Sequence, residues 1–305
     1  MTQSNQPLHP IALGTIFLGS DNLIRHLDFQ TTSFALHEAV ARGSNFLDTS
    51  YFYGLGECER LLAPFIKYHG RDRLFVSTKA GHHFSQGKWS FKSSADFLTQ
   101  SIEAALERLD TDYLDLFTVH SLEESDSLDE SLEVLMNYKD KGILRHIGLH
   151  EASLNTLGFM NQTNAIDVYF GHYSVFNASA EQAIFPYLLE HSIAFIPYLP
   201  LKKGLHDDRP GLDLGRNPSI EYPLHSVQHR ALCDRIRFKT RQLQPLADRY
   251  HTSMASLLRA YYLEHPLIET LIADIKTKVH VKNYYDCLEI NLSLHDIQRI
   301  QRIFA

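Results

Sequence analysis

The residues best suited to chemistry in this 305-residue chain lie at the ends of short apolar runs. They are Asp48 in NFLDTS, Tyr53 just beyond that run, Lys79 in LFVSTK and His120 in LDLFTVH. A carboxylate, a phenol, an amine and an imidazole are side chains that enzymes use to move protons. Their position at strand ends raises the question of whether they meet in one site.

Together these four side chains could protonate a carbonyl oxygen. A phenol has a pKa of about 10, and an ammonium at about 4 Å favours the phenolate by up to ~4 kcal/mol at an effective dielectric of 20, or about three pKa units. Lys79 would thus make Tyr53 a general acid near neutral pH, with Asp48 keeping Lys79 charged and aimed. His120 would fix the substrate oxygen. The hydride for such a reduction must come from a cofactor.

Each residue also has an ordinary structural interpretation. An acid after a strand often caps a turn, and a tyrosine within YFY often packs against the wall of the protein. A strand-end lysine is usually solvated, and a single histidine is usually a satisfied core residue. Taken one at a time, the structural interpretation is favoured. Their shared placement at strand ends favours the functional one.

Eight short apolar runs alternate with longer helical patterns along the chain. The runs are residues 11–16, 45–50, 74–79, 114–120, 146–150, 167–173, 194–199 and 268–273. Apolar residues recur at spacings of three and four residues in four segments, which predicts helices. These segments are residues 34–43, 101–109, 131–142 and 245–266. Such alternation requires parallel strands with helical crossovers. The sequence therefore predicts an α/β fold, a (β/α)₈ TIM barrel, as a single domain over residues 1–305.

An open doubly wound sheet is the competing fold, but no strand here runs into a G-x-G-x-x-G turn. In a barrel the carboxyl ends of all strands surround one mouth, so Asp48, Lys79 and His120 should converge. Residues 202–229 follow the seventh strand and are rich in Gly, Pro and charge. They are expected to form a long loop on the active face.

Composition excludes several classes of partner. A net charge of -7 gives no reason to expect nucleic acid or an anionic membrane surface as a partner. Cys58, Cys233 and Cys287 lack metal-site spacing and are expected to be free thiols in a reducing compartment. The polar start MTQSNQPLHP is unlike a signal peptide, and no apolar run approaches the roughly 20 residues of a membrane span. We expect a cytoplasmic protein.

The sequence resembles an aldo-keto reductase from LGTIFLG near its start to about residue 290. FLDTSYFYG with GECERLL resembles the family's aspartate–tyrosine segment, FVSTKAG its lysine strand, and LDLFTVH its histidine strand. The resemblance implies a TIM barrel that reversibly reduces a small-molecule carbonyl substrate, usually with NADP(H). It also implies a catalytic tetrad, which would consist of Asp48, Tyr53, Lys79 and His120. Tyr198 falls on the tyrosine that stacks against the nicotinamide.

The chain departs from the family where the cofactor is usually held. His150 and Glu151 stand where a Ser-Asn pair usually grips the carboxamide, and Phe170 replaces a glutamine. After the eighth strand, ADIKTKVHVKNYYDC lacks the usual 2′-phosphate pattern.

Two interpretations of this last segment are open. Lys276, Lys278 and Lys282 beside a helix N-terminus could hold a phosphate, which favours NADP(H). Alternatively, Asp274 could accept hydrogen bonds from a free ribose hydroxyl, which makes NAD(H) possible. A surface helix with solvated lysines is the structural alternative. We favour NADP(H), with His150, Tyr198, Lys276 and Lys278 as the candidate cofactor-binding residues.

Two other classes of function compete with a reductase. His120, His150, His172 and Asp274 at strand ends could hold metal in a hydrolase, but the first strand lacks the H-x-H pair common in such barrels. The adjacent pair His82-His83 is no substitute, because neighbouring strand residues point apart. We expect no metal. A barrel that binds a nucleotide or a partner without turnover is the second alternative. The sequence predicts no oligomeric state.

Overall fold

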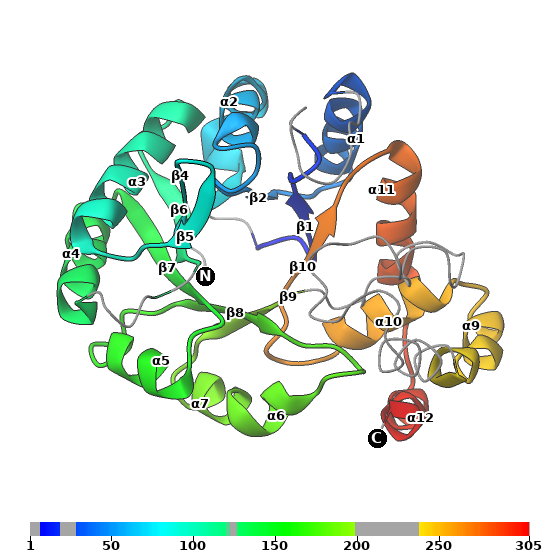
Figure 1. Cartoon of the computed structure of the whole chain (residues 1–305). Coiled ribbons are helices and arrows are strands. Elements are labelled where there is room, and N and C mark those ends of the chain that lie inside the picture. The colour runs from blue at the N-terminus through cyan, green and yellow to red at the C-terminus, as the bar shows by residue number, and fades with distance from the viewer. Residues whose placement is uncertain (1–6, 19–28, 121, 123–126, 199–237, 305) are drawn as a thin grey trace.

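Within the residues that the structure describes, eight parallel strands form a nearly closed barrel with helices around it (Figure 1). The structure is a computed structural model. It describes residues 7–18, 29–120, 122, 127–198 and 238–304. Residues 202–229, for which the sequence predicts a loop on the active face, lie outside the described residues.

The strand order around the barrel follows the chain. The strands are β1 (Ile11–Gly14), β2 (Phe46–Asp48), β3 (Phe75–Ala80), β6 (Leu114–Val119), β7 (Leu144–His150), β8 (Val168–His172), β9 (Ala194–Tyr198) and β10 (Leu271–Asp274). They pair in the order β10-β1-β2-β3-β6-β7-β8-β9, with all of these pairs parallel. At the remaining seam, Phe195 N–H donates to the Leu267 carbonyl at 3.0 Å. The predicted (β/α)₈ barrel is confirmed.

Helices lie outside the ring of strands (Figure 1). They are α1 (Phe29–Ala41), α2 (Glu57–His69), α3 (Ala95–Leu109), α4 (Leu128–Asp140), α5 (Leu154–Met160), α6 (Ser179–Ala183), α7 (Phe185–Glu190), α9 (Gln244–Arg249), α10 (Met254–Leu263), α11 (Lys278–Tyr285) and α12 (Leu294–Phe304). Serine side chains cap the N-termini of several of these helices. The hydroxyls of Ser127 and Ser153 accept hydrogen bonds from the first turns of α4 and α5.

Two apolar clusters hold the barrel together. The smaller one fills the barrel interior and contains Ala12, Phe46, Phe75, Leu116, Val168, Phe170 and Ile196. The larger one lies between the strands and the helices and includes Leu36, Leu62, Leu98 and Ile102. Because side chains alternate along a strand, every barrel strand except β7 contributes apolar residues to both clusters. The interior cluster fixes which residues point into the barrel.

The structure corrects the helical prediction for residues 245–266. This segment forms two helices, α9 and α10, and not one continuous pattern. The break follows from local chemistry, because the Ser253 hydroxyl accepts a hydrogen bond from Ser256 N at 3.0 Å and starts a new helix.

A hairpin absent from the prediction follows β3. Strands β4 (His82–Ser85) and β5 (Lys88–Phe91) pair antiparallel. Gln86 and Gly87 between them have φ values of 50° and 75°. Two successive positive φ values characterise the tight turn that suits two twisted strands.

The remaining predictions from composition are tested in part. Cys58 and Cys287 are buried thiols outside any disulfide, whereas Cys233 lies outside the described residues. Among the helices of the described ranges, none has both the length and the apolar character needed to cross a bilayer.

Candidate active site

Strand alternation places the predicted catalytic side chains at one end of the barrel interior. Asp48 lies two residues beyond Phe46, and Lys79 lies four residues beyond Phe75. Both phenylalanines belong to the interior cluster, so the even spacing turns the acid and the lysine inward as well. His120, just past the end of β6, follows the same rule. All three lie where the strands end, at the mouth of the barrel.

Asp48 and Lys79 form a buried ion pair. Lys79 Nζ lies 2.6 Å from Oδ1 and 2.5 Å from Oδ2 of Asp48, and both side chains are at most 5% exposed. The Ser77 hydroxyl donates to Asp48 Oδ1 at 3.2 Å, and Lys79 also donates to the Thr49 carbonyl at 3.2 Å. These contacts fix the ammonium group in position and keep both buried charges partnered.

Tyr53 lies in the loop between β2 and α2. Its backbone N–H donates to the Ser50 carbonyl at 3.0 Å, and the centre of its ring is 6.0 Å from Lys79 Nζ. The loop needs Gly56, whose φ is 84° and whose missing Cβ leaves room for the side chain of Arg108. The structure therefore places the Tyr53 ring beside Lys79, and its role as proton donor stays a prediction.

His120 packs among aromatic rings beside this pair. Its ring centre is 4.4 Å from that of His150 and 4.2 Å from that of His82, both edge to face. Burial, and secondly the positive charges that His150, His82 and Lys79 can carry, lower the pKa of His120 far below its ordinary value. The imidazole is thus neutral at neutral pH. Its Nδ1 is buried without a hydrogen-bond partner among the described residues.

His150 is the last residue of β7, the strand that pairs with β6, and Glu151 follows it. Burial, followed by the charge of Lys79, lowers the pKa of His150 to about 3. Glu151 has a left-handed backbone with φ of 53°, and its Oε1 lies 3.1 Å from His172 Nε2. A neutral imidazole and a carboxylate–histidine pair therefore occupy the region where the resemblance places a carboxamide grip.

Asp274 stands on the opposite side of the mouth from His150. In the strand register, Gly14 of β1 pairs with Asp48 on one side and Asp274 on the other. Asp274 Oδ1 lies only 2.5 Å from the place where a Cβ on Gly14 would be, so the missing side chain admits the carboxyl. Burial raises the pKa of Asp274 to about 6, the charge of Lys276 opposes this, and Asp48 adds to the rise.

Lys276 and Lys278 stand at the start of α11, beyond β10. Lys276 Nζ lies 4.4 Å from the centre of the Phe17 ring, and Lys278 is the exposed first residue of the helix. The Thr277 hydroxyl accepts a hydrogen bond from His280 N at 3.4 Å, and the first turn has no acidic residue. A helix N-terminus flanked by two cations has the chemistry of a phosphate site.

Tyr198 is the last residue of β9, and its backbone lies opposite His172 in the strand register. This places the residue at the same mouth. Its predicted stacking on a nicotinamide ring stays a prediction.

His82 is the site residue that the sequence interpretation missed. Its ring packs 4.2 Å from His120 and 4.5 Å from Phe52, and burial lowers its pKa. The signal was present in HHFSQGKWSF, where Gln-Gly separates two runs that contain aromatic residues. Such a pattern is typical of a hairpin, which brings its first residue back over the strand end.

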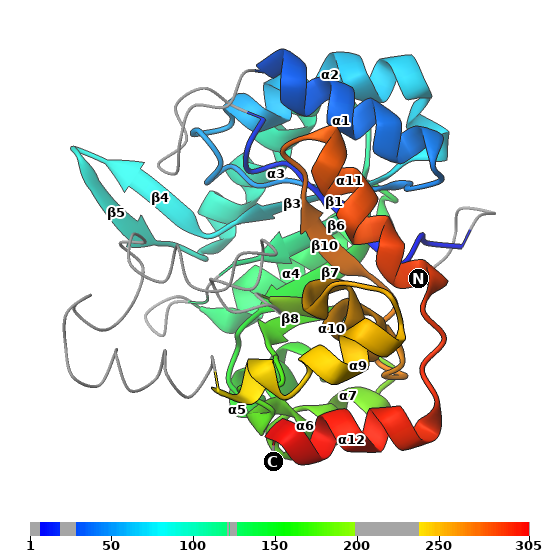
Figure 2. The ribbon, with the colours of Figure 1, turned by 90° about the vertical axis from the view of Figure 1, so that its right-hand side faces the viewer.

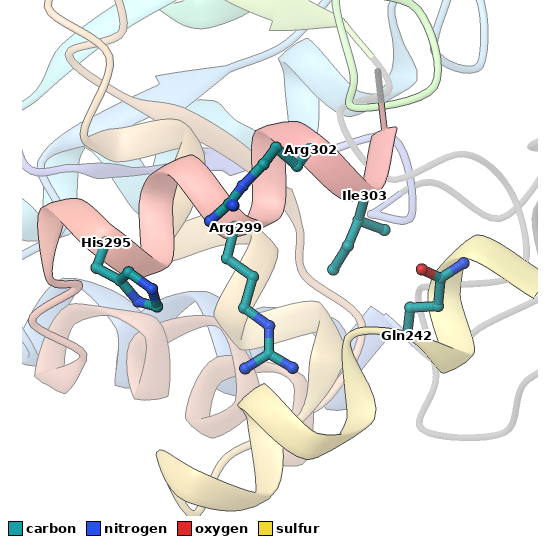
Figure 3. Close-up of a pocket in the computed structure, with 5 residues that line it drawn as sticks. All are labelled: Gln242, His295, Arg299, Arg302 and Ile303. Carbon is teal, nitrogen blue, oxygen red and sulfur yellow. The ribbon is translucent and has the colours of Figure 1, made fainter.

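Two other features bear on the nature of the site. Within the part of the chain that the structure describes, no three His, Cys, Asp or Glu side chains are grouped so as to hold a metal ion. A surface hollow lies elsewhere, between α12 and the segment before α9 (Figure 3). It is lined by Gln242, His295, Arg299, Arg302 and Ile303 and shares no residue with the barrel mouth.

Comparisons with known proteins agree with this arrangement. The model of the aldo/keto reductase family matches residues 10–305, and the chain belongs to this family. An aldo-keto reductase of Gibberella moniliformis is 35% identical over 204 residues, which cover 65% of this chain and 60% of that protein. Curated relatives such as this one are matched over 59% to 65% of their own length.

Solved structures share the fold. An aldo-keto reductase from Bacillus halodurans in its holo form superposes with a TM-score of 0.80 at 24% identity, covering 99% of this chain and 94% of that one. An aldo-keto reductase from Klebsiella pneumoniae in complex with NADPH gives 0.72 at 22% identity, covering 97% and 91%. At these identities the likeness concerns the barrel itself.

Proposed function

We propose that this protein reduces the carbonyl group of a small aldehyde or ketone to an alcohol. When bound, a nicotinamide nucleotide would supply the hydride for the carbonyl carbon, and Tyr53 would give its hydroxyl proton to the carbonyl oxygen. The observation that carries this proposal is the buried Asp48–Lys79 ion pair beside the Tyr53 ring. Membership of the aldo/keto reductase family supports it.

Lys79 acts on Tyr53 through its charge. When the phenol gives up its proton, a positive charge held nearby stabilises the phenolate that remains. Asp48 holds the ammonium with both carboxylate oxygens and the Thr49 carbonyl receives a further hydrogen bond, so the charge is preorganised. Both residues therefore serve the proton donor and need not touch the substrate.

His120 orients the carbonyl oxygen. Because its pKa is lowered, the ring is neutral and does not compete with Tyr53 as a proton donor. A neutral imidazole N–H can still donate a hydrogen bond to the oxygen on which negative charge develops. Its tight packing against His82 and His150 holds the ring in one orientation.

We favour NADP(H) over NAD(H) as the cofactor. Lys276, Lys278 and the start of α11 offer a cationic site for a phosphate. The Asp274 carboxyl occupies the space left by the missing side chain of Gly14, and it interacts with the charges of Lys276 and, more weakly, Asp48. The NADPH complex of the Klebsiella pneumoniae neighbour points the same way. His150 and Tyr198 are then assigned to the nicotinamide end.

The alternatives are less well supported. A metal-dependent hydrolase needs a cluster of ligands at the mouth, and none is grouped there among the described residues. A non-catalytic barrel has no need for a buried lysine paired to an acid beside a tyrosine, because such a pair is costly to bury without further use.

Fluorescence titration with NADPH and with NADH, followed by assays of nucleotide oxidation with a panel of aldehydes, tests the proposal. We expect tighter binding of NADPH and aldehyde-dependent oxidation that a chelator does not reduce. Tighter binding of NADH would favour NAD(H) as the cofactor, with Asp274 accepting hydrogen bonds from the free ribose hydroxyl. Failure to bind either nucleotide, or activity lost on chelation, would overturn the proposal.

A further inference from the structure

The β4–β5 hairpin stands directly over the candidate active site. It begins at His82, three residues after Lys79, and extends past the strand ends on the side of the mouth (Figure 2). The hairpin is fixed at its base, where Lys92 N–H donates to the Gly81 carbonyl at 2.8 Å. A fixed base beside the tetrad gives its side chains a defined place relative to the reacting groups.

The two faces of the hairpin differ in chemistry. The register pairs His82 with Phe91 and His83 with Ser90, so these two pairs point to opposite faces. His83 contacts Phe97 of α3, with ring centres 5.8 Å apart, which anchors its face against the helix layer. The face with His82 and Phe91 is therefore directed towards the mouth.

A continuous row of rings leads outward from the proton donor on this mouth face. Successive ring centres are 6.4 Å apart for Tyr53 and Phe52, 4.5 Å for Phe52 and His82, and 4.9 Å for His82 and Phe91. Burial lowers the pKa of His82, so this ring is uncharged at neutral pH like its neighbours. Phe91, at the outer end, is 45% exposed.

We propose that this row of rings is the outer wall of the substrate site and selects carbonyl compounds that carry an aromatic ring or an extended apolar group. The inference rests on the proposed carbonyl reduction and names its substrate class. Rings at centre separations of 4.5–7 Å attract one another in edge-to-face or offset contacts, and an aromatic substituent can extend the row. A substrate held by its carbonyl at Tyr53 and His120 would lay that substituent along Phe52 and His82 towards Phe91.

The test compares an aromatic aldehyde, cinnamaldehyde, with a small one, propanal, in the full-length protein with saturating NADPH. We expect Phe91→Ser to lower the ratio of kcat/KM for cinnamaldehyde over propanal about fivefold to tenfold, mainly through KM, which is the worth of one good aromatic contact. Phe91→Tyr keeps the ring and should restore the ratio. Phe34→Ser, at a 62% exposed phenylalanine on α1, is the matched control and should change neither constant.

If Phe91→Ser left the ratio of kcat/KM for cinnamaldehyde over propanal unchanged, or if Phe34→Ser lowered it equally, the proposal that the row of rings forms a wall of the substrate site would be wrong. Failure of the wild-type protein to oxidise NADPH with either aldehyde would instead overturn the proposed carbonyl reduction. The two failures are therefore distinguishable in the same set of assays.

Discussion

Three of the four proposed catalytic residues, Asp48, Lys79 and His120, owe their common position to strand alternation, and Tyr53 comes from the loop after β2. Asp48 and Lys79 share a strand face with phenylalanines that fill the barrel, so their spacing in the sequence already turns them inward. That much could be predicted. The orientation of Asp274 could not, because it depends on the missing side chain of Gly14 on a neighbouring strand. The contact of His82 with His120 likewise depends on a hairpin that was not foreseen.

The neutrality of His120 leads to a prediction on pH dependence. Because the pKa of His120 lies far below 6.5, kcat/KM for carbonyl reduction should show no ionisation of His120 near that pH. His120→Leu, which removes the hydrogen-bond donor, should lower kcat about 10²–10³-fold, and His120→Gln should lose less. Rate profiles between pH 5 and 8 provide the measurement. A limb with an apparent pKa near 6.5 that disappears in His120→Gln would show that the protonated imidazole is the active form.

At the scale of elements, the strands were predictable and their connections less so. All eight barrel strands coincide with apolar runs, because a strand buried on both faces reads as a continuous apolar segment. The boundary between α9 and α10 depends on the cap at Ser253, a local hydrogen bond within a longer helical pattern. The hairpin was missed because only its Gln-Gly turn marks it in the sequence.

Glu59 joins three of these elements. Its carboxylate is fully buried on α2 and accepts hydrogen bonds from Thr78 of β3 and Arg108 of α3, both at 2.6 Å. Glu59→Gln leaves the buried arginine without its acid, so the free energy of unfolding should fall by about 3 kcal/mol. Urea unfolding at pH 7 measures this change.

The pair Glu38–Arg42 at the C-terminal end of α1 is the matched control, because it is largely exposed and its members are four residues apart. Glu38→Gln should change the free energy of unfolding by less than about 0.5 kcal/mol. Equal effects of the two substitutions would show that Glu59 does not hold the elements together.

At the scale of the whole molecule, the barrel fold could be predicted from the sequence, whereas the residues that bind the cofactor could not. Alternation of strands and helices suffices to predict the fold, since few architectures accommodate it. The nucleotide contacts depart from the family's usual residues, and pattern alone cannot replace them. We propose the start of α11 and the groups around His150 in their place.

Buried neutral histidines make the whole molecule sensitive to acid. Burial lowers the pKa of His9, His37, His69, His82, His120, His150 and His265. The unfolded chain then binds more protons than the folded one below pH 6.5, so the free energy of unfolding falls as pH falls through that value. For His150, with a folded pKa of about 3, the loss is about 2 kcal/mol by pH 5.

Asp274 acts in the opposite direction. Its pKa in the folded protein is about 6, above the ordinary value for an aspartate. The folded chain therefore binds this proton more readily than the unfolded chain, and the free energy of unfolding from this group rises as pH falls from 6 towards 4. Urea unfolding at pH 7, 6 and 5 should still show a net loss, and Asp274→Asn should steepen it. A stability that is constant or rises towards pH 5 would contradict the burial of neutral histidines.

The most direct measurement of the central claim is the rate of alcohol formation by Tyr53→Phe with saturating NADPH and aldehyde. The substitution removes only the hydroxyl, so the nucleotide should bind with unchanged affinity. The rate should fall about 10²–10⁴-fold, the usual worth of a positioned general acid. A Tyr53→Phe variant that turned over at the wild-type rate would show that the proton comes from another group and that the proposed site is wrong.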